Sequence, residues 1–112
     1  AGQNGMIFRT TSGGIGITQI SSVIPERFRL MQNYPNPFNP VTKIRFELPS
    51  AMMVSVEIFD AAGKPVVKPE TDYLKTGTYE ITFDGSQLAS GVYFCRISAG
   101  NYSYAIRMTM VK

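Results

Sequence analysis

Few side chains in this sequence could carry out acid–base or nucleophilic chemistry. The chain has no histidine, which excludes the catalytic triads and zinc sites that depend on that residue. Its one cysteine, Cys95, alternates with Tyr93 and Ile97 in an apolar pattern that favours a buried thiol over an activated nucleophile. A single cysteine also cannot form an internal disulfide. We therefore expect this chain not to be an enzyme and to hold no cofactor.

Two aspartates are the next candidates, because carboxylates can bind calcium or act in pairs. Asp60 begins a D-x-x-G turn and Asp84 begins a D-G turn, and the aspartate at such a position hydrogen-bonds the turning backbone. The turns explain both residues, so no metal site is predicted.

A last group of aromatic and basic residues could form a surface on which sugars stack. Core and edge packing explains these residues equally well. They are Tyr102, Tyr104, Arg96 and Arg107.

Length and composition limit the chain to one modest domain with an appendage. Of its 112 residues 44% are hydrophobic, which is enough for one core but not for a second domain. The 11 basic and 8 acidic residues give a net charge of +3 and are scattered singly, whereas a nucleic-acid interface needs basic residues on one face. No apolar run reaches the roughly 18 residues of a membrane span. We expect neither nucleic-acid binding nor a membrane span.

The elements that must position these side chains are β-strands. From Pro25 onward the hydrophobic residues alternate with the period of two that half-buried strands require. The first four expected strands are residues 25–30, 42–48, 54–60 and 65–67. The last of them is expected at a sheet edge, because Pro65 has no N–H to donate. The expected inward side chains are Phe28, Leu30, Ile44, Phe46, Leu48, Val54, Val56 and Ile58.

The second half of the chain continues the pattern. Residues 67–76 are polar and are expected to form a loop, and strands follow at residues 77–83, 91–99 and 102–111. The expected inward side chains are Tyr79, Ile81, Phe83, Tyr93, Cys95, Ile97, Ile106, Met108 and Met110. Seven short strands with turns between them and no competing helix predict an all-β antiparallel sandwich.

One segment, residues 32–40, fits neither helix nor central strand. Its sequence is QNYPNPFNP, and each proline lacks an N–H and pushes the residue before it out of the α region. Tyr34 and Phe38 are large enough to hold the segment against a sheet, and the asparagine side chains can replace lost backbone hydrogen bonds. We therefore expect an ordered segment rather than a flexible linker.

Residues 1–24 differ in character from the rest. They are glycine-rich, nearly uncharged, and open at Ala1, which suggests a piece of a longer protein. Residues 2–14 resemble a β-propeller blade of the Asp-box kind, although Ser12 stands where that pattern has aspartate and Ile17 where it usually has tryptophan. We expect residues 1–24 to be a remnant of an upstream cargo domain or a linker. They should be disordered or pair with a strand edge of this domain or of another copy.

Three blocks of residues 25–112 resemble the type A C-terminal sorting domain of type IX secretion. The first, residues 30–49, reads LMQNYPNPFNPVTKIRFELP; the second, residues 56–66, is a strand followed by D-x-x-G-x-x-V; the third runs from GTY at 77 through FDG and ASGVYF to MTMVK at 112. The motif positions are Asn33, Pro35, Asn36, Pro37, Phe38, Asn39, Pro40, Asp60, Gly63, Gly77, Asp84 and Gly91. Departures at Phe59, Phe83 and Cys95 concern packing.

The resemblance implies an immunoglobulin-like sandwich that directs an attached cargo through the periplasm and outer membrane to the cell surface or the medium. Its partners would be the outer-membrane secretion machinery and a sortase-like peptidase, with cleavage near Pro25 and Glu26. We expect the machinery to read the last strand. The residues expected to be read are Met108, Thr109, Met110, Val111 and Lys112. The alternative is an immunoglobulin-like carbohydrate-binding or spacer module of an extracellular enzyme.

Overall fold

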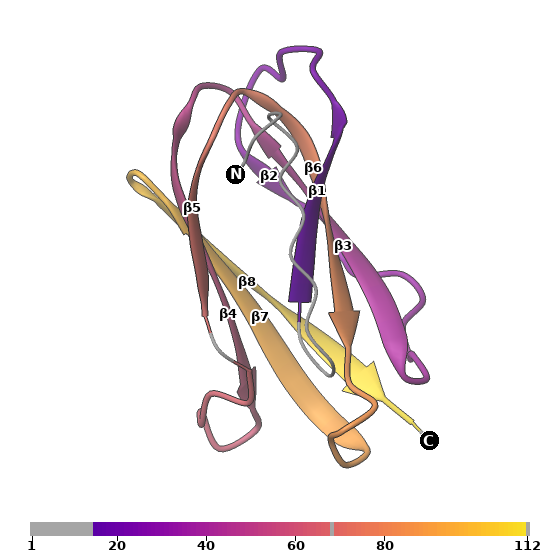
Figure 1. Ribbon diagram of the computed structural model, residues 1–112. Coiled ribbons are helices and arrows are strands. Elements are labelled where there is room, and N and C mark those ends of the chain that lie inside the picture. Colours follow the sequence, from indigo (N-terminus) through magenta and orange to yellow (C-terminus); the bar gives the residue numbers. More distant parts are fainter. Residues whose placement is uncertain (1–14, 68, 112) are drawn as a thin grey trace.

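The computed structural model describes residues 15–67 and 69–111, and within them every regular element is a β-strand. The strands form two antiparallel sheets of four (Figure 1). Sheet A has the order β1 (Ile15–Ser21), β6 (Gly77–Asp84), β3 (Val41–Leu48), β2 (Arg29–Leu30). Sheet B has the order β5 (Glu70–Leu74), β4 (Met52–Asp60), β7 (Gly91–Ala99), β8 (Tyr102–Met110). Nowhere in the described ranges does a helix have the length and apolar character that a membrane span requires.

The core is built from the alternate side chains of these strands. β3 and β6 bury every second residue along their whole length, and β4 and β7 do so over residues 54–58 and 93–99, as the hydrophobic pattern predicts. Ile106 differs from expectation because it is only partly buried. It lies on an edge strand whose first half is exposed, and β2, the strand of sheet A that contacts β8, is only two residues long.

The described residues contain eight strands rather than the seven expected. The segment 65–67 is not a strand: it makes a single bridge between Pro65 and Phe59, because proline cannot extend the ladder as a donor. The expected loop at residues 67–76 contains β5, which pairs with β4. Its sequence reads as polar because an edge strand buries few side chains, and here Leu74 is the buried one.

The eighth strand, β1, comes from the segment that we expected to be a remnant or linker. It pairs with β6 and contributes Ile15 and Ile17, each 3% exposed, to the common core. Gly77 permits this approach, because its φ is +145° and a Cβ there would collide with the Ser21 carbonyl. Pairing with the domain's own edge was one of the expected alternatives. Residues 2–14, which carry the propeller resemblance, lie outside the described residues.

Replacing Phe46 by alanine should test the core. The ring is fully buried and stacks on Tyr79 with 5.4 Å between centroids, so its loss leaves a cavity between the sheets. The free energy of unfolding should fall by about 3 to 5 kcal/mol in a urea titration. Val23→Ala is the control, since that side chain is 76% exposed and should change stability by less than about 0.5 kcal/mol. An unchanged midpoint for Phe46→Ala would contradict the burial.

A candidate recognition surface at the last strand

The proline segment, residues 32–40, lies along the outer edge of β8. The Phe38 N–H donates to the Thr109 carbonyl, and the Val111 N–H donates to the Phe38 carbonyl, both over 2.9 Å. The Thr109 N–H donates to the side-chain oxygen of Asn36 over 3.1 Å. The loop and the end of β8 accordingly lie on the same side of the molecule in Figure 1. These bonds occupy the end of the outer edge of β8, which would otherwise be open to another chain.

Carbonyl groups of the proline segment find partners beyond their own backbone. The Pro35 carbonyl accepts bonds from the Asn33 side-chain amide at 3.1 Å and from the Thr42 hydroxyl at 2.8 Å. The same amide also donates to the Thr42 oxygen at 3.0 Å. Both side chains are almost fully buried, and no buried side-chain polar atom among the described residues lacks a partner. The segment is therefore fixed by a satisfied polar network rather than being a flexible linker.

Two further contacts join the proline segment to its surroundings. The Gly85 N–H donates to the Pro40 carbonyl at 2.9 Å, and a Cβ at Gly85 would lie 2.7 Å from the Met110 sulfur. The Gln32 side-chain amide donates to the Arg107 carbonyl at 2.7 Å. Our sequence analysis missed Gln32, Thr42 and Gly85. Thr42 could have been found from the alternation of β3 alone, because it occupies an inward position two residues before Ile44.

Only one of the two aromatic rings holds the segment in place. Phe38 is 1% exposed and meets Phe83 edge to face at 5.7 Å between centroids. Tyr34 is 81% exposed, contrary to expectation. Its backbone pairs with Lys43 of β3, and opposite residues of an antiparallel pair project to the same face. Since Lys43 faces solvent, Tyr34 does too.

The five residues expected to be read by a partner differ in accessibility. Met108 and Met110 are buried in the core and expose almost no surface. Thr109 is half-buried and Val111 is 48% exposed. Lys112 lies outside the described residues. A partner at this end would therefore meet Thr109 and Val111 together with the proline segment.

The motif residues at turns serve the backbone, as expected. The Asp60 carboxylate accepts bonds from the N–H groups of Ala62 and Lys64, and Gly63 takes the left-handed conformation with φ +85°. The Asp84 carboxylate accepts the Ser86 N–H at 2.9 Å. Gly91, with φ +156°, begins β7. In the ranges 15–67 and 69–111 no group of three potential ligands could hold a metal ion.

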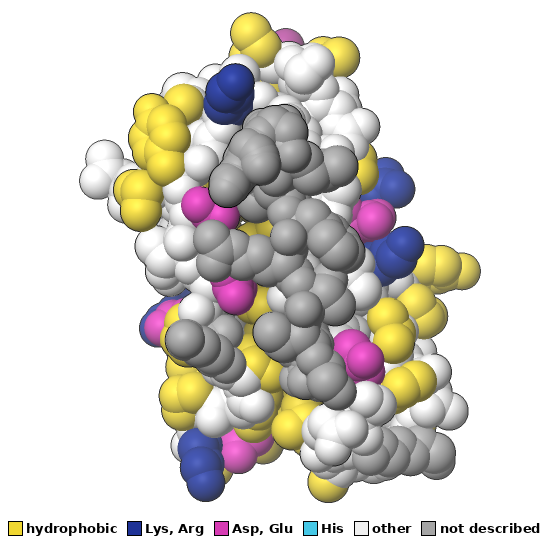
Figure 2. Space-filling view, in the orientation of Figure 1, with side chains coloured by type: hydrophobic (Ala, Val, Ile, Leu, Met, Phe, Trp, Pro, Cys, Tyr) yellow, Lys and Arg dark blue, Asp and Glu magenta, His cyan; other side chains and the backbone are white. Residues whose placement is uncertain are grey.

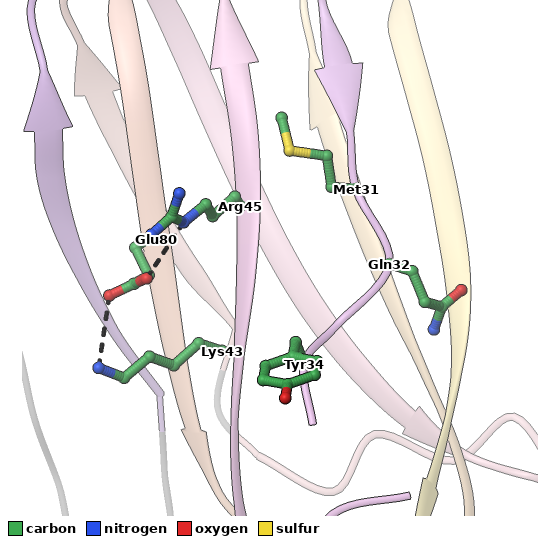
Figure 3. Close-up of a pocket in the computed structure, with 6 residues that line it drawn as sticks. All are labelled: Met31, Gln32, Tyr34, Lys43, Arg45 and Glu80. Carbon is green, nitrogen blue, oxygen red and sulfur yellow. Dashed lines mark hydrogen bonds and ion pairs between the residues drawn. The ribbon is translucent and has the colours of Figure 1, made fainter. Parts of the chain in front are cut away.

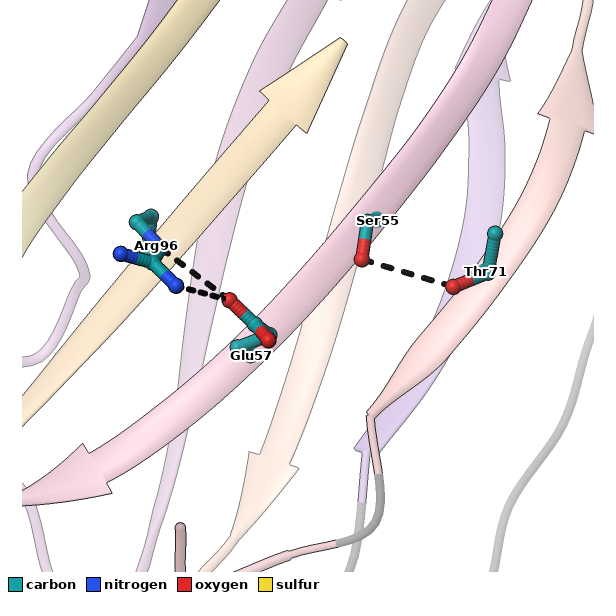
Figure 4. Close-up of polar contacts among 4 residues, drawn as sticks. All are labelled: Ser55, Glu57, Thr71 and Arg96. Atoms are coloured by element: carbon teal, nitrogen blue, oxygen red, sulfur yellow. Dashed lines mark hydrogen bonds and ion pairs between the residues drawn. The ribbon is translucent and has the colours of Figure 1, made fainter. Parts of the chain in front are cut away.

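The aromatic and basic side chains near the end of the chain do not form one surface. Tyr102 and Tyr104 stack on Phe28 with centroid distances of 5.1 and 5.4 Å. Arg96 lies on the outer face of sheet B, where it donates to Glu57 over 2.6 Å (Figure 4). Its guanidinium group also lies 5.0 Å from the centroid of the Phe59 ring. The tyrosines therefore serve packing, and the arginine is already paired within the outer face.

The contacts in Figure 4 connect neighbouring strands of sheet B without forming a site. Ser55 and Thr71 join β4 to β5 at 3.4 Å, and Glu57 with Arg96 joins β4 to β7. Side chains this exposed contribute at most about 1 kcal/mol per pair. On the face shown in Figure 2 charged side chains of both signs are dispersed, with no massed basic patch.

Cys95 has the environment of an inert thiol. It is fully buried, and burial raises the pKa of the thiol to about 12. Burial likewise raises the pKa of Tyr79, whose hydroxyl donates to the Lys75 carbonyl at 2.8 Å. Because the thiolate is the reactive form, the native fold suppresses nucleophilic chemistry at Cys95.

Comparison with known proteins gives one result that covers most of the chain. A family model described as "Secretion system C-terminal sorting domain" matches residues 32–112. The match begins at the proline segment and includes β3 to β8. The proline segment and β8, which bond each other, therefore both lie inside the matched residues. No curated protein matches the chain.

Removing the Asn36 side chain should loosen the last strand locally. In Asn36→Ala the Thr109 N–H loses its acceptor, so its hydrogen exchange should become about tenfold faster, which corresponds to roughly 1.4 kcal/mol. Asn101→Ala, in the exposed turn between β7 and β8, is the matched control and should leave that amide unchanged. Equal exchange rates at Thr109 in the wild type and in Asn36→Ala would contradict the bond.

The raised pKa of Cys95 predicts both its reactivity and a pH effect on stability. A thiol-specific chromogenic disulfide at about pH 8 should label the native chain far more slowly than the chain in guanidinium. The unfolded thiol has a pKa near 8.5, so above that pH the unfolded state loses its proton first and the stability contributed by Cys95 falls. Cys95→Val should remove this part of the pH dependence. Rapid labelling of the native chain would contradict the buried environment.

Proposed function

We infer the function of this chain from its family: it belongs to the secretion system C-terminal sorting domains, and it is a C-terminal sorting signal of type IX secretion. The signal leads to the cell surface or the extracellular space, and it implies contact with the secretion machinery. The family consists of sorting signals rather than catalysts. This assignment favours the sorting function over the alternative of a carbohydrate-binding or spacer module.

We propose that the domain is recognised as a folded unit made of the proline segment and β8. The observation that supports this most directly is the set of bonds from Phe38 and Asn36 to Thr109 and Val111. Because these bonds occupy the last residues of the outer edge of β8, a partner that reads this end meets exposed side chains and the proline segment, not an open row of backbone groups. Pairing with the edge itself would first require the proline segment to leave.

We also propose that the sandwich is immunoglobulin-like. The succession β2, β3 and β6 in sheet A and β4, β7 and β8 in sheet B follows the A-B-E and C-F-G strands of that fold. β1 then takes the edge position beside β6. The consequence for function is that the chain's last strand corresponds to the edge strand G.

Cleavage by a sortase-like peptidase is proposed for the connection between β1 and β2, near Pro25 and Glu26. Val23 is 76% exposed and Ile24 is 67% exposed, and these residues lie outside any strand. Irregular, exposed segments are the usual sites of proteolysis. This cut would leave β1 on the cargo side, so the upstream cargo would separate only when β1 leaves β6, and surface attachment or release would follow.

The sorting function can be tested by export of a reporter. Residues 1–112 should be fused behind a signal peptide and a fluorescent protein, since β1 is part of sheet A and belongs in the fusion. The fusion should reach the surface of a type IX-competent cell and stay in the periplasm of a strain that lacks the translocon. Equal delivery in both strains would refute the sorting function.

A truncation in the same assay should separate recognition from folding. Deleting residues 109–112 removes the partners of Phe38 and Asn36 and should abolish delivery. The melting temperature of the purified variant must be measured alongside, because the deletion also removes Met110 from the core. Loss of delivery in a variant that still folds supports a direct role of this end; delivery that persists without residues 109–112 would refute it.

A further inference from the structure

An open groove of about 470 Å³ lies on the outer face of sheet A, directly beside the proline segment (Figure 3). We propose that it binds a carboxylate-bearing segment of the export machinery and so forms part of the sorting signal. Its lining residues are Met31, Gln32, Tyr34, Lys43, Arg45 and Glu80. This inference rests on the sorting function proposed above, and it names a surface and a partner chemistry that the last strand alone does not provide.

The charges of the groove favour an acidic partner. Lys43 and Arg45 share a single carboxylate, Glu80, at 3.6 and 3.3 Å. Their side chains are 56% and 58% exposed, whereas that of Glu80 is 17% exposed. Figure 3 shows the two basic side chains on either side of the acidic one. The groove therefore presents surplus positive charge to solvent, which complements carboxylates on a partner.

Tyr34 supplies the aromatic anchor of the groove. Its ring is 81% exposed, but its backbone N–H and carbonyl both bond Lys43, at 2.9 and 3.1 Å. The neighbouring Asn33 is buried in the polar network. Because the backbone of Tyr34 is already fixed, binding orders only its side chain, and tyrosine and arginine are enriched among residues that dominate binding energy.

Hydrogen bonds connect one wall of the groove to the last strand. Gln32, one of its lining residues, bonds the Arg107 carbonyl of β8, and four residues further on Asn36 bonds Thr109. The proline segment thus forms one wall of the groove and the cover of the β8 edge at once.

Delivery of the reporter fusion should depend on the groove. Tyr34→Ala and the double variant Lys43→Gln/Arg45→Gln should each lower surface delivery by about tenfold or more, with an unchanged melting temperature. Tyr73→Ala, which removes a 60% exposed ring from sheet B, is the matched control and should deliver normally. The charge-conserving variant Lys43→Arg/Arg45→Lys should retain most of the delivery.

The outcomes separate this inference from the sorting function. Translocon-dependent delivery of the wild type establishes sorting, and normal delivery by the groove variants would then overturn the groove alone. Flotation of the wild type, but not of the double variant, with vesicles of phosphatidylcholine and phosphatidylglycerol would assign the groove to a lipid surface and overturn the protein partner. A concentration-dependent dimer that Tyr34→Ala dissociates would assign the groove to a second copy and also overturn it.

Discussion

The shortage of backbone donors in the proline segment is the constraint on which this structure depends. Three of the nine residues have no N–H group, so carbonyl oxygens of the segment are satisfied by groups other than its own backbone. The donors come from the Asn33 side chain, from Thr42 of β3, from Gly85 after β6 and from Val111 after β8. A segment that could not form a regular element is thereby bound to three parts of the sandwich at once.

The buried hydrogen bonds of Asn33 and Thr42 contribute more to stability than the partly exposed ion pairs do. Asn33 and Thr42 are almost fully buried, and losing one partner would leave the other with a desolvated polar group at a cost of about 1 to 3 kcal/mol. The pairs Arg29 with Glu47 and Arg96 with Glu57 are partly exposed, and solvent screens them. The position of the segment therefore depends on the polar network and not on the exposed ion pairs.

Two strand edges of the sandwich are occupied by other segments of the chain. β1 pairs along β6, and the proline segment bonds the last residues of β8, so these backbone groups are not open to another chain. An occupied edge offers specific side chains to a partner and does not pair with the backbone of any chain that approaches it. In the recognition that we propose, the machinery meets exposed side chains around Thr109 and Tyr34 instead of an open ladder.

The sequence by itself determined the strands of the core and the family. Alternation places Ile44, Phe46 and Leu48 on one face in any sheet, because the side-chain period of a strand is two. The family motif from Asn33 to Pro40 can be recognised from the sequence alone. Tertiary structure alone decided the rest. β5 and β1 are strands because they lie beside β4 and β6, and neither has a strong hydrophobic alternation of its own. The exposure of Tyr34, the partnership of Asn36 with Thr109 and the groove at Lys43 all depend on contacts between residues far apart in the chain. Local patterns contain no information on such contacts, because the physical cause of each is the position of a neighbouring strand.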